Sequence, residues 1–201
     1  PQSLEDLTKP EYANLLVVEN PATSSTGLAF LLATVAHFGD GYLDYWRDLK
    51  ANGVIVVDGW ETAYYTYFSG SSARGPQPMV VSYASSPAAE VIFADPPITE
   101  APTASIVSPG TCYRQIEFAG ILAGTPRRLL AEKFIDYMLS VPFQEDIPMQ
   151  MFMFPVNQSA QWPDEFSQWT QVVEFPAILD PSLVALHREE WVNAWTDIVL
   201  R

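Results

Sequence analysis

The sequence has little of several residue types that carry chemistry in proteins. It contains one cysteine, Cys112, which excludes an internal disulfide and a multi-cysteine zinc site. Only 10 lysines and arginines stand against 24 aspartates and glutamates, so the net charge is -14. Such a charge argues against nucleic acid and anionic membranes as partners, whereas a cationic ligand suits it.

Long apolar runs are also absent. No stretch reaches the roughly 18 apolar residues that a transmembrane helix needs, and residues 1–4 lack the basic and apolar parts of a signal peptide. We therefore expect either a cytosolic protein or a chain that lacks the start of a longer precursor. Hydrophobic residues nevertheless make up 48% of the 201 residues, which is enough to form a core.

The usual motifs of catalysis are missing as well. The sequence has no Gly-x-Ser-x-Gly elbow, no Walker loop and no His-x-x-x-His pair. His37 lies within the apolar pattern of a helix and His187 among the charges of another, so we expect structural roles for both. Cys112 has no activating neighbour in the sequence. We expect no catalytic residue, no metal site and no cofactor.

Strands and helices alternate in the first half of the chain. Apolar runs predict strands at 15–18, 54–57 and 79–83, and helical spacing predicts helices near 25–39, 42–51 and 61–68. The run at 54–57 has no polar alternation, which is typical of a parallel strand covered on both faces. This order predicts an α/β fold whose lobe has three layers and a mainly parallel sheet.

The pattern changes after residue 93. A proline-rich connection precedes two expected strands, 104–107 and 113–118. Helices are expected at 126–139, from 141 to a close at Ile147-Pro148, and from Asp180-Pro181 onward, where Asp and Pro suit the first helical positions.

Polar turns follow the three expected strands of the first half. Ser24 or Ser25 would cap the first long helix, whose free backbone N–H groups and dipole attract anions. Trp60 and Tyr83 follow the next two strands, where ring faces attract cations, and Ser85 starts another helix. Because parallel strands end at one sheet edge, these turns would form a ligand site. The competing interpretation makes the serines simple caps and the rings part of the core or its rim.

These motifs resemble those of the thiamine-binding subfamily of bacterial ABC-transporter solute-binding proteins, which have the type 2 periplasmic-binding fold. The stretches that carry the resemblance are residues 20–28 (NPATSSTGL), 59–64 (GWETAY), 81–88 (VSYASSPA), 115–117 (QIE), 131–134 (AEKF), 143–148 (FQEDIP) and 153–156 (MFPV). Their order covers nearly the whole chain.

The resemblance implies a two-lobed clamshell that closes on thiamine or a thiamine phosphate and delivers it to an ABC permease without catalysis. It implies a periplasmic or extracellular location, with or without a lipid anchor. Ser24 and its neighbours would hold the hydroxyl or phosphate end of the ligand, and Trp60 and Tyr83 would pack on its rings. The implied ligand-binding residues are Ser24, Ser25, Thr26, Trp60, Tyr83, Ser85 and Phe152.

Two positions depart from the family pattern. Phe152 stands where the family tends to have a tryptophan, and Ala89 stands where a relative has a tyrosine. The loss of a ring leaves open a roomier pocket, or one for a related pyrimidine or another cation. The alternatives to thiamine capture are a sensor module of the same fold and an anion-binding relative that uses Ser24 and Ser85.

The family pattern also implies how the chain is divided. Residues 13–112 and 157–201 would form the C-terminal α/β lobe. Residues 1–12 and 113–156 would form the inter-lobe crossings and part of the N-terminal lobe. Family members have a further N-terminal segment that forms most of this second lobe, and we expect that segment of the same protein as a partner.

Overall fold

The computed structural model describes residues 1–72 and 74–201, which fall into two compact units. Unit 1 consists of Pro1–Ala84, Thr103–Arg114 and Val172–Arg201, and unit 2 consists of Ser85–Pro102 and Gln115–Gln171. The lobe boundaries implied by the resemblance stay a prediction.

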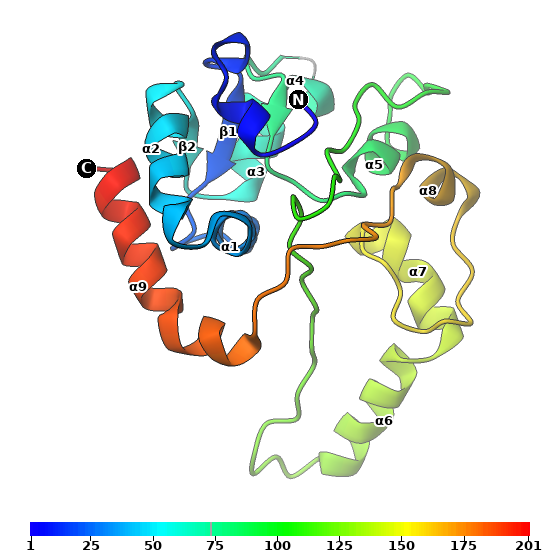
Figure 1. Ribbon diagram of the computed structural model, residues 1–201. Coiled ribbons are helices and arrows are strands. Elements are labelled where there is room, and N and C mark those ends of the chain that lie inside the picture. Colours follow the sequence, from blue (N-terminus) through cyan, green and yellow to red (C-terminus); the bar gives the residue numbers. More distant parts are fainter. Residues whose placement is uncertain (73) are drawn as a thin grey trace. The chain divides into compact units, whose positions relative to one another are not determined.

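The strands described in unit 1 form a parallel sheet (Figure 1). They are β1 (Leu16–Glu19), β2 (Ile55–Val57) and β3 (Met79–Val80), in the order β2-β1-β3. Every residue of the central strand β1 is buried, whereas β2 and β3 are half-buried edge strands. The prediction of a parallel sheet is confirmed. The expectation that 54–57 is covered on both faces is wrong, because Ile55, Val56 and Val57 are only half-buried.

Three long helices belong to the same unit. They are α1 (Ser25–Phe38), α2 (Tyr42–Ala51) and α9 (Pro181–Val199). Shorter helical segments complete it: η1 (Glu5–Thr8), η2 (Pro10–Tyr12), η3 (Gly39–Gly41), α3 (Trp60–Thr62), the π-helix η4 (Ala63–Tyr67) and α4 (Ser69–Ser72).

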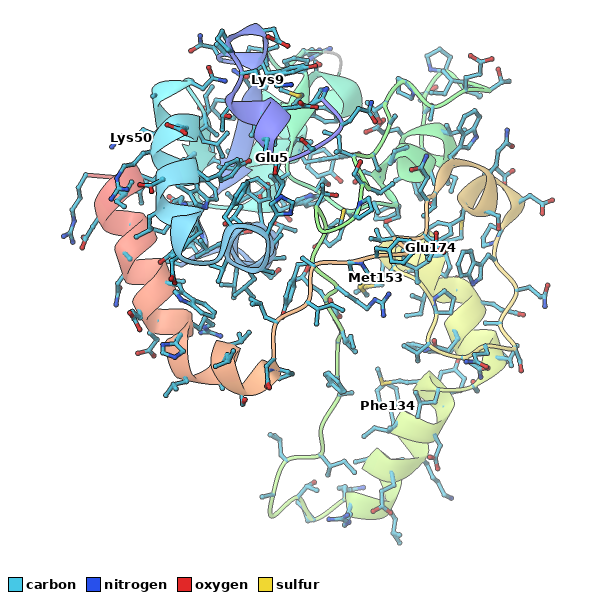
Figure 2. All side chains as sticks on the ribbon, in the orientation of Figure 1. Glu5, Lys9, Lys50, Phe134, Met153 and Glu174 are labelled. Carbon is cyan, nitrogen blue, oxygen red and sulfur yellow. The ribbon has the colours of Figure 1, made fainter. Side chains whose placement is uncertain are left out.

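The core of unit 1 joins the C-terminal helix to the first helices. The fully buried rings of Trp46 in α2 and Trp195 in α9 meet edge to face, with 5.4 Å between their centroids. Trp46 Nε1 also donates to Thr34 Oγ1 of α1 at 2.9 Å. At the end of α2, Lys50 Nζ donates to the carbonyl of Ile198 at 2.8 Å (Figure 2). These contacts hold α9 against α2.

The regular secondary structure described in unit 2 is helical. Its helices are α5 (Ser86–Ile92), α6 (Arg128–Met138), α7 (Val141–Met151) and α8 (Asp164–Trp169). The expected end of a helix at Ile147-Pro148 is wrong, because α7 continues through Pro148 to Met151. Pro148 removes only one backbone hydrogen bond, and it is buried together with Gln144, so packing offsets that loss.

The two strands expected at 104–107 and 113–118 do not form. Tyr113 makes only an isolated parallel bridge with Ala177. Strand formation depends on a neighbouring strand that completes the hydrogen bonds, and among the described residues these segments have none. The alternation of Tyr113 to Phe118 therefore leaves an extended connection, in which Phe118 is exposed.

Candidate functional site

The N-terminus of α1 is built from the turn that follows β1. Ser24 has extended backbone geometry and its hydroxyl accepts from the backbone N–H of Gly27 at 3.4 Å, so its predicted capping role is confirmed. Its Oγ also lies 2.8 Å from Oγ1 of Thr26. A Cβ added at Gly27 would lie 2.4 Å from the carbonyl oxygen of Glu19. Only glycine therefore lets the first turn of α1 pack directly on the end of β1.

Hydrogen bonds and a ring contact tie the three strand-end turns of unit 1 together. Thr23 Oγ1, after β1, donates to the carbonyl of Asp58, after β2, at 2.7 Å. Trp60 Nε1 donates to Ser82 Oγ, after β3, at 2.9 Å, and the Trp60 and Tyr83 rings lie 5.7 Å apart. Because β1 lies between β2 and β3, the indole spans the carboxyl edge of the sheet.

Two tyrosines on the π-helix extend the ring cluster. Trp60 stacks on the buried Tyr64, with 4.7 Å between centroids and 18° between planes, and it meets the exposed Tyr65 edge to face at 5.5 Å. The sequence predicted an ordinary helix at 61–68 and assigned no ligand role to these residues. The backbone N–H of Phe68 bonds to the carbonyl of Ala63, five residues earlier, and no local signal announces this wider turn.

The remaining predicted ligand-binding residues, Ser85 and Phe152, lie in unit 2. Ser85 precedes α5, yet it is 2% exposed, and its hydroxyl donates to the carbonyl of Phe152. Phe152 ends α7 in the left-handed conformation, with φ of 55°, and its ring meets that of Phe93 edge to face. Ala89 is half-buried in α5. The ligand roles of Ser85 and Phe152 stay predictions.

A buried carboxyl that the sequence reasoning missed lies behind the turn of Ser24. Glu19, the last residue of β1, is 1% exposed, and neither carboxyl oxygen has a hydrogen-bond partner among the described residues. Burial raises the pKa of Glu19 to about 8, while the nearby hydroxyl of Thr26 lowers the pKa, without reaching hydrogen-bond geometry. The carboxyl is therefore mostly protonated at neutral pH. The signal in the sequence for this burial was the position of Glu19 directly after the apolar run 15–18.

The surroundings of the two histidines and the cysteine favour structural roles over catalytic ones. His37 Nε2 lies 2.7 Å from Glu5 Oε1, and His187 pairs with Glu190 and stacks on Trp191. Burial raises the pKa of the Cys112 thiol, which disfavours the reactive thiolate. Within residues 1–72 and 74–201, no group of three or more His, Cys, Asp or Glu side chains is placed to hold a metal ion.

Comparison with known proteins shows the family. The family model for bacterial extracellular solute-binding proteins matches residues 1–172. The chain belongs to this family. The resemblance drawn from the sequence motifs is thereby confirmed, and this solute-binding protein has the expected α/β fold. None of its described helices combines the length and apolar character needed to cross a membrane.

Similar proteins include several that are named thiamine-binding periplasmic proteins. The chain is 31% identical to the thiamine-binding periplasmic protein of Brucella suis over 196 residues, which are 97% of this chain and 56% of that protein. It is 31% identical to the protein of the same name in Escherichia coli over 204 residues, which cover 100% of this chain and 58% of that one. The chain thus spans little more than half the length of these relatives.

Solved structures give the same picture of the fold. A periplasmic thiamin binding protein superposes with a TM-score of 0.80 at 28% identity, over 100% of this chain and 60% of that one. The periplasmic binding protein P5PA superposes with a TM-score of 0.69 at 15% identity, over 99% of this chain and 60% of that one, and this likeness concerns the fold alone.

Proposed function

We propose that this solute-binding protein captures thiamine or a thiamine phosphate and delivers it to an ABC permease, without catalysis, metal or cofactor. The main support is the sheet edge of unit 1, where the rings of Trp60 and Tyr83 lie close together and the turn before Ser24 is hydrogen-bonded to the turn before Trp60. The names of the similar proteins support the same ligand. We propose a periplasmic or extracellular location, with or without a lipid anchor.

The chemistry of this edge matches both ends of such a ligand. Thiamine carries a cationic thiazolium ring and an aminopyrimidine ring, and aromatic faces attract cations by about 0.5–2 kcal/mol. The tail is a hydroxyl or a phosphate, and the N-terminus of the 14-residue helix α1 attracts an anion through its dipole and free N–H groups. The net charge of -14 favours the approach of a cation.

We propose that the rest of the full-length protein covers an exposed apolar face of unit 2. Phe134 of α6 is 58% exposed and is labelled in Figure 2. Large exposed apolar patches are unusual on a folded protein unless something covers them. The occupant we favour is the segment of the same protein that the relatives' greater length implies. The exposed residues of and beside α6 are Leu129, Leu130, Phe134, Tyr137 and Leu139.

A fluorescence titration tests the ligand proposal in the full-length protein. Thiamine bound against Trp60 should quench its emission, so Trp60→Phe should lose the quenching and weaken binding. Trp191→Phe is the matched control, because Trp191 stacks on His187 in α9, and it should leave the titration unchanged. Equal thiamine affinity in Trp60→Ala and the wild type would overturn the proposal.

Calorimetry separates thiamine capture from the anion-binding alternative. An anion binder that uses the turn of Ser24 should bind inorganic phosphate and not thiamine. The proposed function instead requires a measurable heat of binding for thiamine itself. Ser24→Ala should weaken thiamine phosphate more than thiamine, because a capping hydroxyl beside the phosphate is lost. A protein that binds phosphate but not thiamine would show that the anion-binding reading is correct.

A further inference from the structure

We propose that Thr23 sets the distance between the two ends of the ligand site, and that it thereby favours ligands that reach both ends. One end is the N-terminus of α1, where the hydroxyl or phosphate tail would bind, and the other is Trp60, where the rings would bind. The inference rests on the proposed function, since it concerns the same site. Thr23 is a positioning residue, because its hydroxyl contacts the protein and not the ligand.

A hydrogen bond from a side chain joins the two ends. Thr23 directly precedes the residue that caps α1, and its Oγ1 donates to the carbonyl of Asp58 at 2.7 Å, the ordinary length of such a bond. Only Gly59 separates Asp58 from Trp60. The same hydroxyl lies 3.4 Å from the carbonyl of Asn20, but its one hydrogen serves the shorter contact better.

The backbone pairing of the sheet stops short of this link. Strands β1 and β2 pair up to Glu19 and Val57, and the N–H of Asn20 donates to the carbonyl of Val57 at 2.8 Å. Thr23 and Asp58 lie beyond this bond, which is the last that the described backbone makes between the two segments. The hydroxyl of Thr23 therefore holds the two turns together where the ladder of the sheet has ended.

Each end of the site is also held by contacts of its own. Trp60 Nε1 donates to Ser82 Oγ at 2.9 Å. The first turn of α1 packs on the end of β1, because a Cβ added at Gly27 would lie 2.4 Å from the carbonyl oxygen of Glu19. Loss of the Thr23 hydroxyl should therefore change the spacing of the two ends and leave each of them intact.

A fixed spacing benefits only a ligand that spans it. When one end of such a ligand binds, the other end is already near its partner, so the second contact costs little further entropy. Thiamine phosphate carries its rings and its phosphate at opposite ends and meets this condition. A thiamine analogue whose hydroxyethyl tail is replaced by hydrogen occupies the ring end alone. The contribution of Thr23 should therefore appear with the first ligand and not with the second.

Titration calorimetry of the full-length protein with these two ligands tests the inference. Thr23→Val removes the hydroxyl and keeps the branched shape, and the exposed carbonyl region of Asp58 can bind water instead. The affinity for thiamine phosphate should fall about two- to tenfold, the effect of one net hydrogen bond, while the affinity for the tailless analogue should change less than about twofold. Thr23→Ser keeps a hydroxyl and should restore the affinity for thiamine phosphate.

Thr8→Val is the matched control. The hydroxyl of Thr8 donates to the carbonyl of Glu5 at 2.9 Å within η1 and its C-terminal end, outside the strand-end turns. The same substitution thus removes the same kind of hydrogen bond elsewhere in unit 1. It should leave the affinities for both ligands unchanged.

The outcomes separate this inference from the proposed function. Equal affinity of Thr23→Val and the wild type for thiamine phosphate overturns the role of Thr23 alone, as does an equal loss for both ligands or a failure of Thr23→Ser to restore binding. Binding of thiamine without binding of thiamine phosphate or of the tailless analogue does the same. Binding of neither thiamine nor thiamine phosphate overturns the proposed function, and the role of Thr23 falls with it.

Discussion

The indole N–H of Trp60 donates to the hydroxyl of Ser82 across the carboxyl end of the central strand. The two residues follow the two outer strands, β2 and β3, so one hydrogen bond links both edges of the sheet. The ring of Tyr64 stacks on one face of the indole. The orientation of Trp60 is thus set before any ligand arrives, which lowers the entropy that binding would cost.

We expect Ser82→Ala to weaken thiamine binding about two- to tenfold, the effect of one net hydrogen bond that holds a ligand-facing ring. Titration calorimetry of the full-length protein measures the change. In a Trp60→Phe background, which lacks the indole N–H, Ser82→Ala should have no further effect. Equal losses in both backgrounds would show that Ser82 acts independently of Trp60.

Glu19 should make the stability of the protein depend on pH. An exposed glutamate titrates near 4.5, whereas Glu19 in the folded protein titrates at about 8. Between these values only the folded state holds the proton, so the free energy of unfolding should fall as the pH rises from about 4.5 to about 8, by a few kcal/mol at most.

Urea denaturation of wild type and Glu19→Gln at several pH values in this range measures the effect. The neutral amide holds no titrating proton, so the variant should gain stability relative to the wild type as the pH rises. A difference in unfolding free energy that stays constant with pH would mean that Glu19 titrates at its ordinary value.

Gly27→Ala should destabilise the protein by about 1–3 kcal/mol, because the new Cβ overlaps backbone atoms of Glu19 that have no room to move. The matched control is Gly41→Ala, which meets no atom within 4 Å at an ordinary φ of -83°. Urea denaturation compares the two. Similar unfolding free energies for both variants would show that α1 does not pack this closely on β1.

The two buried tryptophans of the core should respond differently to replacement by phenylalanine. Trp46 donates to Thr34, whereas Trp195 Nε1 is buried without a hydrogen-bond partner among the described residues. Both variants lose packing volume, but only Trp46→Phe also loses a hydrogen bond, which should add about 1 kcal/mol to its cost. Chemical denaturation checks this order, and a larger loss in Trp195→Phe would contradict it.

Local signals in the sequence were sufficient to predict the structure of a segment where its own residues determine that structure. The hydroxyl of Ser24 and the apolar spacing after it predicted the start of α1, and the branched runs predicted parallel strands. The strand-end turns also converge as expected for such a sheet.

Features that depend on distant parts of the chain were not predictable in this way. The burial of Glu19 follows from β1 being the central strand, and the only partial burial of β2 follows from its place at an edge. Residues 113–118 alternate like a strand but lack a partner. Propensity describes what a segment can adopt, and its neighbours decide what it does adopt.

The π-helical turn at Ala63–Tyr67 makes the arrangement of the ring cluster sensitive to the deletion of one residue. Such a turn holds one residue more than an α-helical turn would, so deleting a single residue there would restore ordinary winding. The residues beyond the turn would keep their orientation relative to Trp60, because the wider turn already accommodates the extra residue, and only the rings inside the turn would be rearranged. A one-residue deletion would thereby change how Tyr64 and Tyr65 lie against the indole and create a solute-binding protein with a differently shaped aromatic wall.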